Sequence, residues 1–335
     1  MSGPTQRLTY AFKDCALSLF LWLLSKVTAS VTADDGTGWR RKMAVPENGK
    51  IYTPGLYVLT GEYRPARDIA LVVYCDLVTI DLNGHAIACG SEGSQTVGIK
   101  IKNGNRITVR NGKITQCDIG IQSSGASELT IEQIAFDAVH FIGVDYDGNG
   151  LVVRNCRFED IAGYADEAYA IGVNRPGSNS LIEHCVFRNI ERQSKATDAM
   201  QGEGVGIVVA DGDRNCTIRR NWFENLPTDK PVSIGVFVSQ RASARIEANT
   251  ILDIPNAIGA QSPVEVCENV MIMRYKCEGP IAVHLEPGST LTSNTMLGYT
   301  TPKLGGVDAR DNRLENAVPS RALDTAHEPG VEGSS

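Results

Sequence analysis

Short apolar segments of one shape recur along the chain between about residues 80 and 300. An aliphatic anchor is followed five positions later by a large apolar residue, and Asn or Asp with an aliphatic residue ends the segment, as in VVRNCRFEDI (152–161), LIEHCVFRNI (181–190), TIRRNWFENL (217–226) and RIEANTILDI (245–254). The anchors Val109, Ile131, Val153, Ile182, Ile218, Ile246, Val266 and Leu291 are 22, 22, 29, 36, 28, 20 and 25 residues apart. Such a period predicts a solenoid, whose longer coils contain insertions.

A second apolar segment lies in each unit, as in VGIKI at 97–101, IGIQ at 119–122, IGVD at 142–145 and IGVN at 171–174. Its period-2 alternation, its β-branched residues and the Gly, Ser, Asn and Asp turns between segments are typical of strands. Residues 80–300 carry no sustained i, i+3, i+4, i+7 apolar pattern. The pattern therefore predicts an all-β solenoid with three short strands per coil.

Two columns of identical residues predict how the coils stack. Asn tolerates the left-handed backbone of a sharp turn, and Asn side chains stacked at the ~4.8 Å strand spacing can bond to one another. We therefore expect an Asn ladder and an apolar core stack. The ladder is predicted at Asn221, Asn249, Asn269 and Asn294, and the stack at Phe136, Phe158, Phe187 and Phe223, continued by Ile251, Met271 and Met296.

The segments VTIDLNGHAIACG (78–90) and RITVRNGKI (106–114) resemble the opening coils of the pectate-lyase-like superfamily. The resemblance covers roughly residues 50–315. It implies a right-handed parallel β-helix, a single-stranded solenoid of about 9–10 coils, with a substrate groove along the first strand sheet. Members of this superfamily include lyases, hydrolases, epimerases and non-enzymatic proteins, so the resemblance is specific for fold and not for activity. Signature motifs of polygalacturonases, alginate epimerases and pectate lyases are missing.

The ends of the chain differ from the repeats. Residues 1–33 hold the apolar run CALSLFLWLL and a small-x-small site before Asp34, which favour a secretory signal peptide; a cap helix over the open end of the solenoid is the alternative. We expect the β-helix over 34–315, with an N-terminal cap at 34–77, and a flexible tail at 316–335. The mature chain would then be secreted or periplasmic, without a transmembrane segment.

Net charge and cysteine content bear on the binding partners and the cellular compartment of the protein. The formal net charge of −7 argues against a nucleic-acid partner. Removal of Cys15 with a signal peptide would leave eight of the nine cysteines, an even number that permits disulfides in an exported protein. Cys75–Cys89 and Cys267–Cys277 are close in sequence, while Cys156 and Cys185 also fit the alternative of buried free thiols.

Candidate chemistry lies on the outer face of the first sheet. We interpret the small residues Gly98, Gly120, Gly143, Gly172, Gly206, Gly235, Gly259 and Ala282 as an outward column that floors a shallow trough, with tight packing or bending as the alternative. The next outward column is expected at Lys100, Gln122, Asp145, Asn174, Val208, Phe237, Gln261 and His284. The inserted loops after Ile161, Ile190 and Leu226 lead into the same sheet and are expected to wall this trough.

An extended polysaccharide or glycoconjugate is the expected partner, because planar amides, carboxylates and aromatic rings on a trough suit hydroxyl-rich chains. A lyase or epimerase needs a cation and a base such as His140, whereas a glycoside hydrolase needs two carboxylates. The catalytic candidates are Asp145, Asp147, Arg175, Tyr164 and Asp166, and the substrate-binding candidates are Lys100, Gln122, Asn174, Glu167 and Phe237. Tyr146, Tyr164, Tyr169 and Phe237 are candidates for an aromatic platform.

Other interpretations stay open. Asp145-Tyr-Asp-Gly-Asn-Gly also fits a solvated acidic turn or a Ca²⁺-binding loop, and Ca²⁺ is the one cofactor that the sequence suggests. A non-catalytic binding or scaffold protein is the competing functional class, and an intracellular enzyme acting on a small molecule is a third.

Overall fold

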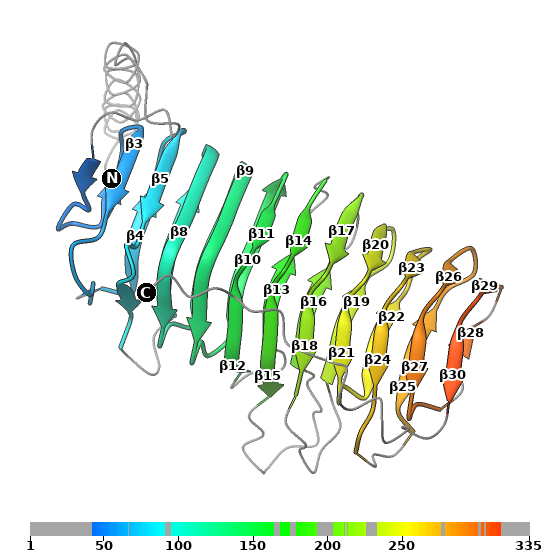
Figure 1. Cartoon of the computed structure of the whole chain (residues 1–335). Helices are drawn as coiled ribbons and strands as arrows, with labels where there is room; N and C mark the ends of the chain where they lie inside the picture. Colours follow the sequence, from blue (N-terminus) through cyan, green and yellow to red (C-terminus); the bar gives the residue numbers. More distant parts are fainter. Residues whose placement is uncertain are drawn as a thin grey trace, which may run out of the picture.

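The computed structural model describes residues 42–65, 67–90, 95–163, 168–174, 179–192, 204–210, 212, 214–225, 233–275, 279–300, 303–304 and 306–315. Over these residues the chain winds as a β-helix whose strands pair in parallel with those of the next coil. Consecutive coils lie side by side from one end of the molecule to the other (Figure 1). The described ranges contain strands and turns but no helix, and hence none that is long and apolar enough to cross a membrane.

Each coil contributes to three parallel sheets. The first sheet contains β2 (Lys50–Ile51), β4 (Ile69–Val73), β7 (Val97–Lys102), the start of β9 (Ile119–Asp137), β10 (Ile142–Asn149), β13 (Ala168–Val173), β16 (Gly204–Val209), β19 (Ser233–Val238), β22 (Asn256–Ala260), β25 (Ile281–Leu285) and β28 (Lys303–Leu304).

The second sheet contains β1 (Lys42–Ala44), β3 (Gly55–Val58), β5 (Val78–Asp81), the start of β8 (Asn105–Thr115), the middle of β9, β11 (Val152–Arg154), β14 (Leu181–Glu183), β17 (Cys216–Arg219), β20 (Ala244–Glu247), β23 (Glu265–Cys267), β26 (Thr290–Thr292) and β29 (Asp308–Arg310).

The third sheet contains β6 (Ala86–Ala88), the ends of β8 and β9, β12 (Arg157–Gly163), β15 (Val186–Arg192), β18 (Trp222–Glu224), β21 (Thr250–Leu252), β24 (Val270–Ile272), β27 (Thr295–Leu297) and β30 (Arg313–Glu315). These are ten strands in consecutive register within the described part of the chain.

The predicted core stack is confirmed. Phe136, Phe158, Phe187 and Phe223 are buried, and successive ring centroids lie 4.6, 5.0 and 4.5 Å apart with nearly parallel planes. Ile251, Met271 and Met296 continue the column in register. One apolar residue per coil at the same inward position makes the stack repeat at the spacing of the sheet.

The Asn ladder is confirmed and is one residue longer than predicted. The amide oxygens of Asn249, Asn269, Asn294 and finally Asn312 each accept bonds from the backbone N–H and the side-chain Nδ2 of the Asn one coil earlier, at 2.9–3.0 Å. The first amide oxygen, that of Asn221, accepts from the Cys185 N–H at 2.9 Å. The Nδ2 groups also donate to backbone carbonyls such as that of Ile246. The ladder therefore satisfies polar groups that the turns between the second and third sheets would otherwise bury unpaired.

The outer face of the second sheet carries charges of alternating sign on successive coils. Its register runs Asp81, Arg110, Glu132, Arg154, Glu183, Arg219, Glu247. Ion pairs link Arg110 to Asp81 at 3.0 Å, Arg154 to Glu132 at 2.6 Å and Arg219 to Glu183 at 2.7 Å. Cations on this face are thus neutralised by the neighbouring coil.

Candidate functional site

The register of the first sheet defines two outward rows, which we call row A and row B. Row A contains Lys50, Val72, Lys100, Gln122, Asp145, Gly172, Val208, Phe237, Gly259 and His284. Row B lies two residues further along the strands and contains Tyr52, Tyr74, Lys102, Ser124, Asp147, Asn174, Ala210, Ser239 and Gln261. Both rows run parallel to the axis of the solenoid, as an extended ligand would.

Two coils are shifted by two residues from the predicted alignment. Asp145 pairs with Gly172 and not with Asn174, and Phe237 pairs with Gly259 and not with Gln261. Ala170 and Ala257 take the small-residue position in these coils, since a Cβ on Gly143 would lie 2.5 Å from the Ala170 carbonyl oxygen. In these two coils the glycine therefore does not mark the small-residue position, and the alignment predicted from it was wrong.

The small-residue column faces the core, so the prediction of a glycine-floored trough is wrong. A Cβ on Gly120, Gly143 or Gly206 would come within 2.7, 2.8 or 2.9 Å of the Phe136, Phe158 or Phe223 ring. These glycines let the backbone pack closely on the aromatic stack, which is the alternative that the sequence left open. Of the glycines predicted for the floor, Gly172 and Gly259 are in row A, on the outer face.

Asp145 is held between two amides from neighbouring coils. Gln122 Nε2 donates to Asp145 Oδ2 at 3.1 Å, and Asn174 Nδ2 donates to Asp145 Oδ1. Asn174 reaches row A from row B because Gly172 leaves the intervening space open: a Cβ there would lie 3.3 Å from Asn174 Oδ1. Three coils thus fix one carboxylate on the outer face, with both carboxylate oxygens oriented by N–H donors.

Asp147 follows Asp145 on the same face of β10. Two residues along a strand place their Cα atoms about 6.6–6.8 Å apart. Asp147 is partly exposed and pairs in register with Ser124. The structure therefore brings together Gln122, Asp145 and Asn174, with Asp147 beside them; we call these four residues the Asp145 cluster.

Other predicted site residues lie elsewhere. Phe237 is three coils from Asp145 in row A, about 14 Å at the strand spacing, and its ring lies over Gly259. Tyr146 is wrong as a platform, because it points into the core and its hydroxyl donates to the Ala126 carbonyl at 3.1 Å. Tyr164, Asp166, Glu167 and Arg175, most of the three inserted loops, residues 1–33 and the tail at 316–335 lie outside the described residues.

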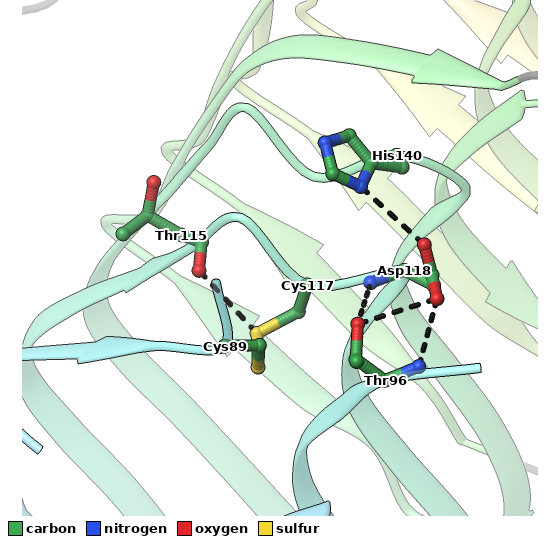
Figure 2. Close-up of a disulfide and its surroundings, with 6 residues drawn as sticks. All are labelled: Cys89, Thr96, Thr115, Cys117, Asp118 and His140. Carbon is green, nitrogen blue, oxygen red and sulfur yellow. Dashed lines mark hydrogen bonds and ion pairs between the residues drawn. A yellow bond between two sulfur atoms is a disulfide. The ribbon is translucent and has the colours of Figure 1, made fainter. Parts of the chain in front are cut away.

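His140 belongs to a different cluster, at the edge where the chain enters the first sheet. Asp118 Oδ2 accepts bonds from the Thr96 N–H at 2.7 Å and the Thr96 hydroxyl at 3.2 Å, while Asp118 Oδ1 lies 3.4 Å from His140 Nδ1 (Figure 2). His140 lies in the bend that precedes β10, whereas Asp145 lies on β10 itself. The candidate base is thus paired with Asp118, a carboxylate that was not predicted.

A disulfide joins Cys89 to Cys117 beside this cluster, 28 residues apart in sequence. The cysteines closest in sequence therefore do not pair: Cys75 and Cys267 are free thiols, as are the buried Cys156 and Cys185. Burial and the negative charge of Asp76 raise the pKa of Cys75 to about 12. Among the described residues, no group of three or more His, Cys, Asp or Glu side chains is arranged to hold a metal ion.

Two further aromatic residues of the outer face, Tyr52 and Tyr74, were not predicted. Tyr52 and Tyr74, at the amino-terminal end of row B, are exposed and stacked with ring centroids 4.8 Å apart. Both precede the segments that reveal the period in the sequence, so the period did not mark them as outward residues. Tyr52 and Tyr74 each lie two residues after a row A residue, Lys50 and Val72 respectively, and this alternation was the sequence signal that could have marked them as outward.

A family model described as the right-handed β-helix region matches residues 76–251, which is more than half of the 335 residues. The chain belongs to this right-handed β-helix family. No sequence among the curated proteins matches the chain.

Several solved structures share the β-helix fold. An alginate lyase from Paenibacillus superposes with a TM-score of 0.54 at 13% identity, covering 78% of this chain and 91% of that one. DFA-IIIase from Arthrobacter chlorophenolicus gives a TM-score of 0.35 at 10% identity, over 80% and 74% of the two chains. The A-module of a mannuronan C-5 epimerase from Azotobacter vinelandii gives 0.31 at 15% identity, over 84% and 91%. At these identities the likeness extends to the fold alone.

Proposed function

We propose that this protein binds an extended polysaccharide along rows A and B and acts on it at the Asp145 cluster. The observation that best supports this proposal is the position of Asp145, whose carboxylate accepts hydrogen bonds from Gln122 and Asn174 on the coils on either side. A carboxylate has about four lone-pair sites, so two N–H donors leave capacity for ligand hydroxyls. The amide oxygens of Gln122 and Asn174 offer further acceptors in fixed positions.

Glycoside hydrolysis is the reaction for which the described residues supply both groups. An inverting hydrolase uses two carboxyl groups ~6.5–9.5 Å apart, one as general acid and one as general base for water. The Cα atoms of Asp145 and Asp147 are about 6.6–6.8 Å apart on one face of a strand, which allows their carboxyl groups to lie within that range. One residue would protonate the leaving oxygen while the other activates the attacking water.

A lyase or epimerase is the second candidate, because Lys100 is two coils from Asp145 in row A and supplies a cation. The alginate lyase from Paenibacillus supports chemistry on a polysaccharide in this fold. It does not select the reaction for this chain. Export from the cytoplasm would bring such an enzyme to its polymer, and residues 1–33 are the proposed signal.

The test is a screen of neutral glycans and uronans with the wild-type protein and two variants, Asp145→Asn and Asn174→Ala. Reducing ends report hydrolysis, ultraviolet absorbance of unsaturated uronic acids reports elimination, and proton NMR reports epimerisation. We expect turnover of one polymer that falls at least 100-fold in Asp145→Asn. Binding without turnover would favour the non-catalytic class, and turnover unchanged in both variants would refute the site.

A further inference from the structure

The amino-terminal end of the same outer face carries cations that no carboxylate of the described residues neutralises. Lys50 and Lys100 lie in row A, separated by Val72, and Lys102 lies in row B. Within the described residues, none of the three ammonium groups has a carboxylate partner. The outer face of the second sheet differs, because its cations Arg110, Arg154 and Arg219 form ion pairs with carboxylates of the neighbouring coil.

Two exposed tyrosines complete this surface. Tyr52 and Tyr74 stack with planes 10° apart, and Lys102 Nζ lies 5.6 Å from the centre of the Tyr74 ring. Neither phenol hydroxyl bonds to a described residue. The ring pair is rigid and amphipathic, and it would lose little conformational entropy on binding. The five residues Lys50, Tyr52, Tyr74, Lys100 and Lys102 form what we call the lysine–tyrosine surface.

The spacing of the charges fits a ligand that runs along the coils. Lys50 and Lys100 are two coils apart, about 9.6 Å at the strand spacing, and Lys100 to Lys102 is about 6.6–6.8 Å along β7. Like charges this close repel, and a bound anion relieves the repulsion. Lys100 is also two coils from Asp145, so one extended chain would cover the lysine–tyrosine surface and the Asp145 cluster together.

We propose that the lysine–tyrosine surface binds the anionic groups of an acidic polysaccharide, while sugar rings pack against Tyr52 and Tyr74. This inference rests on the proposed function, because the proposed function is what identifies the ligand as a polysaccharide. It adds that the ligand is anionic, and that it is held by a binding surface about 10–19 Å from the cleaved bond, which is two to four coils.

Binding is measured by affinity electrophoresis and calorimetry with alginate, polygalacturonate, dextran sulfate, unmodified dextran and an oligodeoxythymidylate. The wild-type protein should bind at least one of the three anionic glycans, more weakly as salt increases, and should not bind dextran. The carboxylated and sulfated probes separate the two sources of anion.

The double variant Lys50→Gln/Lys102→Gln should weaken anionic-glycan binding about tenfold, and Tyr74→Leu about threefold. The matched control is Arg214→Gln/Arg220→Gln, which removes two exposed positive charges near the second sheet and should change affinity less than twofold. Circular dichroism of each variant confirms folding.

The inference is overturned if the lysine variant binds like the wild type, if the arginine control weakens binding equally, or if dextran or the oligonucleotide binds as tightly as the anionic glycans. Its failure is separable from that of the Asp145 cluster. Binding that depends on the lysines, with turnover indifferent to Asp145→Asn, supports the surface and refutes the catalytic site; the reverse pattern refutes the surface alone.

Discussion

Alanine at two glycines of the first sheet should give opposite results, because one faces the core and the other faces outward. A Cβ on Gly143 would lie 2.5 Å from the Ala170 carbonyl oxygen and 2.8 Å from Phe158 Cδ1. A Cβ on Gly172 would first meet the flexible Asn174 amide, at 3.3 Å from Oδ1 and 3.4 Å from Nδ2. Neither glycine has a positive φ, so the backbone itself accepts alanine at both positions.

The free energies of unfolding should therefore differ between the two variants. Replacing glycine by alanine stabilises a protein by about 0.4–1 kcal/mol through the unfolded state where the new methyl fits. At Gly143 overpacking against a backbone carbonyl and a stacked ring costs about 2–3 kcal/mol, leaving a net loss of about 1–2.5 kcal/mol. At Gly172 the amide shifts by a few tenths of an ångström, leaving stability unchanged or raised by up to about 1 kcal/mol.

Thermal and denaturant unfolding followed by circular dichroism measures the difference. A gap of about 2 kcal/mol corresponds to a Tm difference of roughly 3 °C for a chain of this length. Gly172→Ala should also weaken polysaccharide turnover, because the shifted Asn174 amide orients Asp145 less well. Equal destabilisation by the two substitutions, or a neutral Gly143→Ala, would refute the assigned register and the inward direction of the small-residue column.

Further predictions concern stability and reactivity. Asn269→Ala should cost about 3–5 kcal/mol in denaturant unfolding, because several buried ladder groups lose their partners, whereas Asn312→Ala at the partly buried end should cost about 1–2 kcal/mol; equal costs would contradict the ladder. Burial alone would raise the pKa of Glu224, but hydrogen bonds from Arg274 and Trp222 and the charges of Arg274 and Arg188 together outweigh it and hold the pKa below the ordinary 4.5. Its stabilisation should thus be complete above about pH 4.5 and lost as pH falls through the lower folded pKa, so a Glu224→Gln variant should show a flatter acid limb of unfolding free energy against pH. Iodoacetamide at pH 8 should alkylate Cys75 roughly 10³-fold more slowly in the folded protein than in denaturant, as followed by peptide mass mapping, and equal rates would contradict its raised pKa.

The coil, the Phe stack and the Asn ladder could be predicted because each depends on one residue type recurring at one position. Parallel stacking places such residues directly above one another, so residues that recur with the period of the sequence also contact one another in the structure. The two register shifts could not be predicted from glycine alone. Ala-Ile-Gly-Val at 170–173 offers two small residues, and Ala170 takes the inward position next to Gly143, which places Gly172 on the outer face.

The candidate site was predicted in part. Gln122, Asp145 and Asn174 were expected together, yet Asn174 reaches Asp145 from the adjacent row through the gap at Gly172. The Cys89–Cys117 disulfide follows contact between coils, which sequence proximity does not encode. Tyr52 and Tyr74 were not predicted because they precede the recognisable repeat, and no sequence period marks the outward positions there.

The most direct test of the account is the rate at which wild-type protein and Asp145→Asn convert the polysaccharide that the wild type binds best, with unfolding free energies measured in parallel. The account predicts a rate at least 100-fold lower in Asp145→Asn, with binding retained through the lysine–tyrosine surface and with a folded, stable chain. Conversion by Asp145→Asn at the wild-type rate would contradict it, as would a wild-type protein that binds none of the polysaccharides.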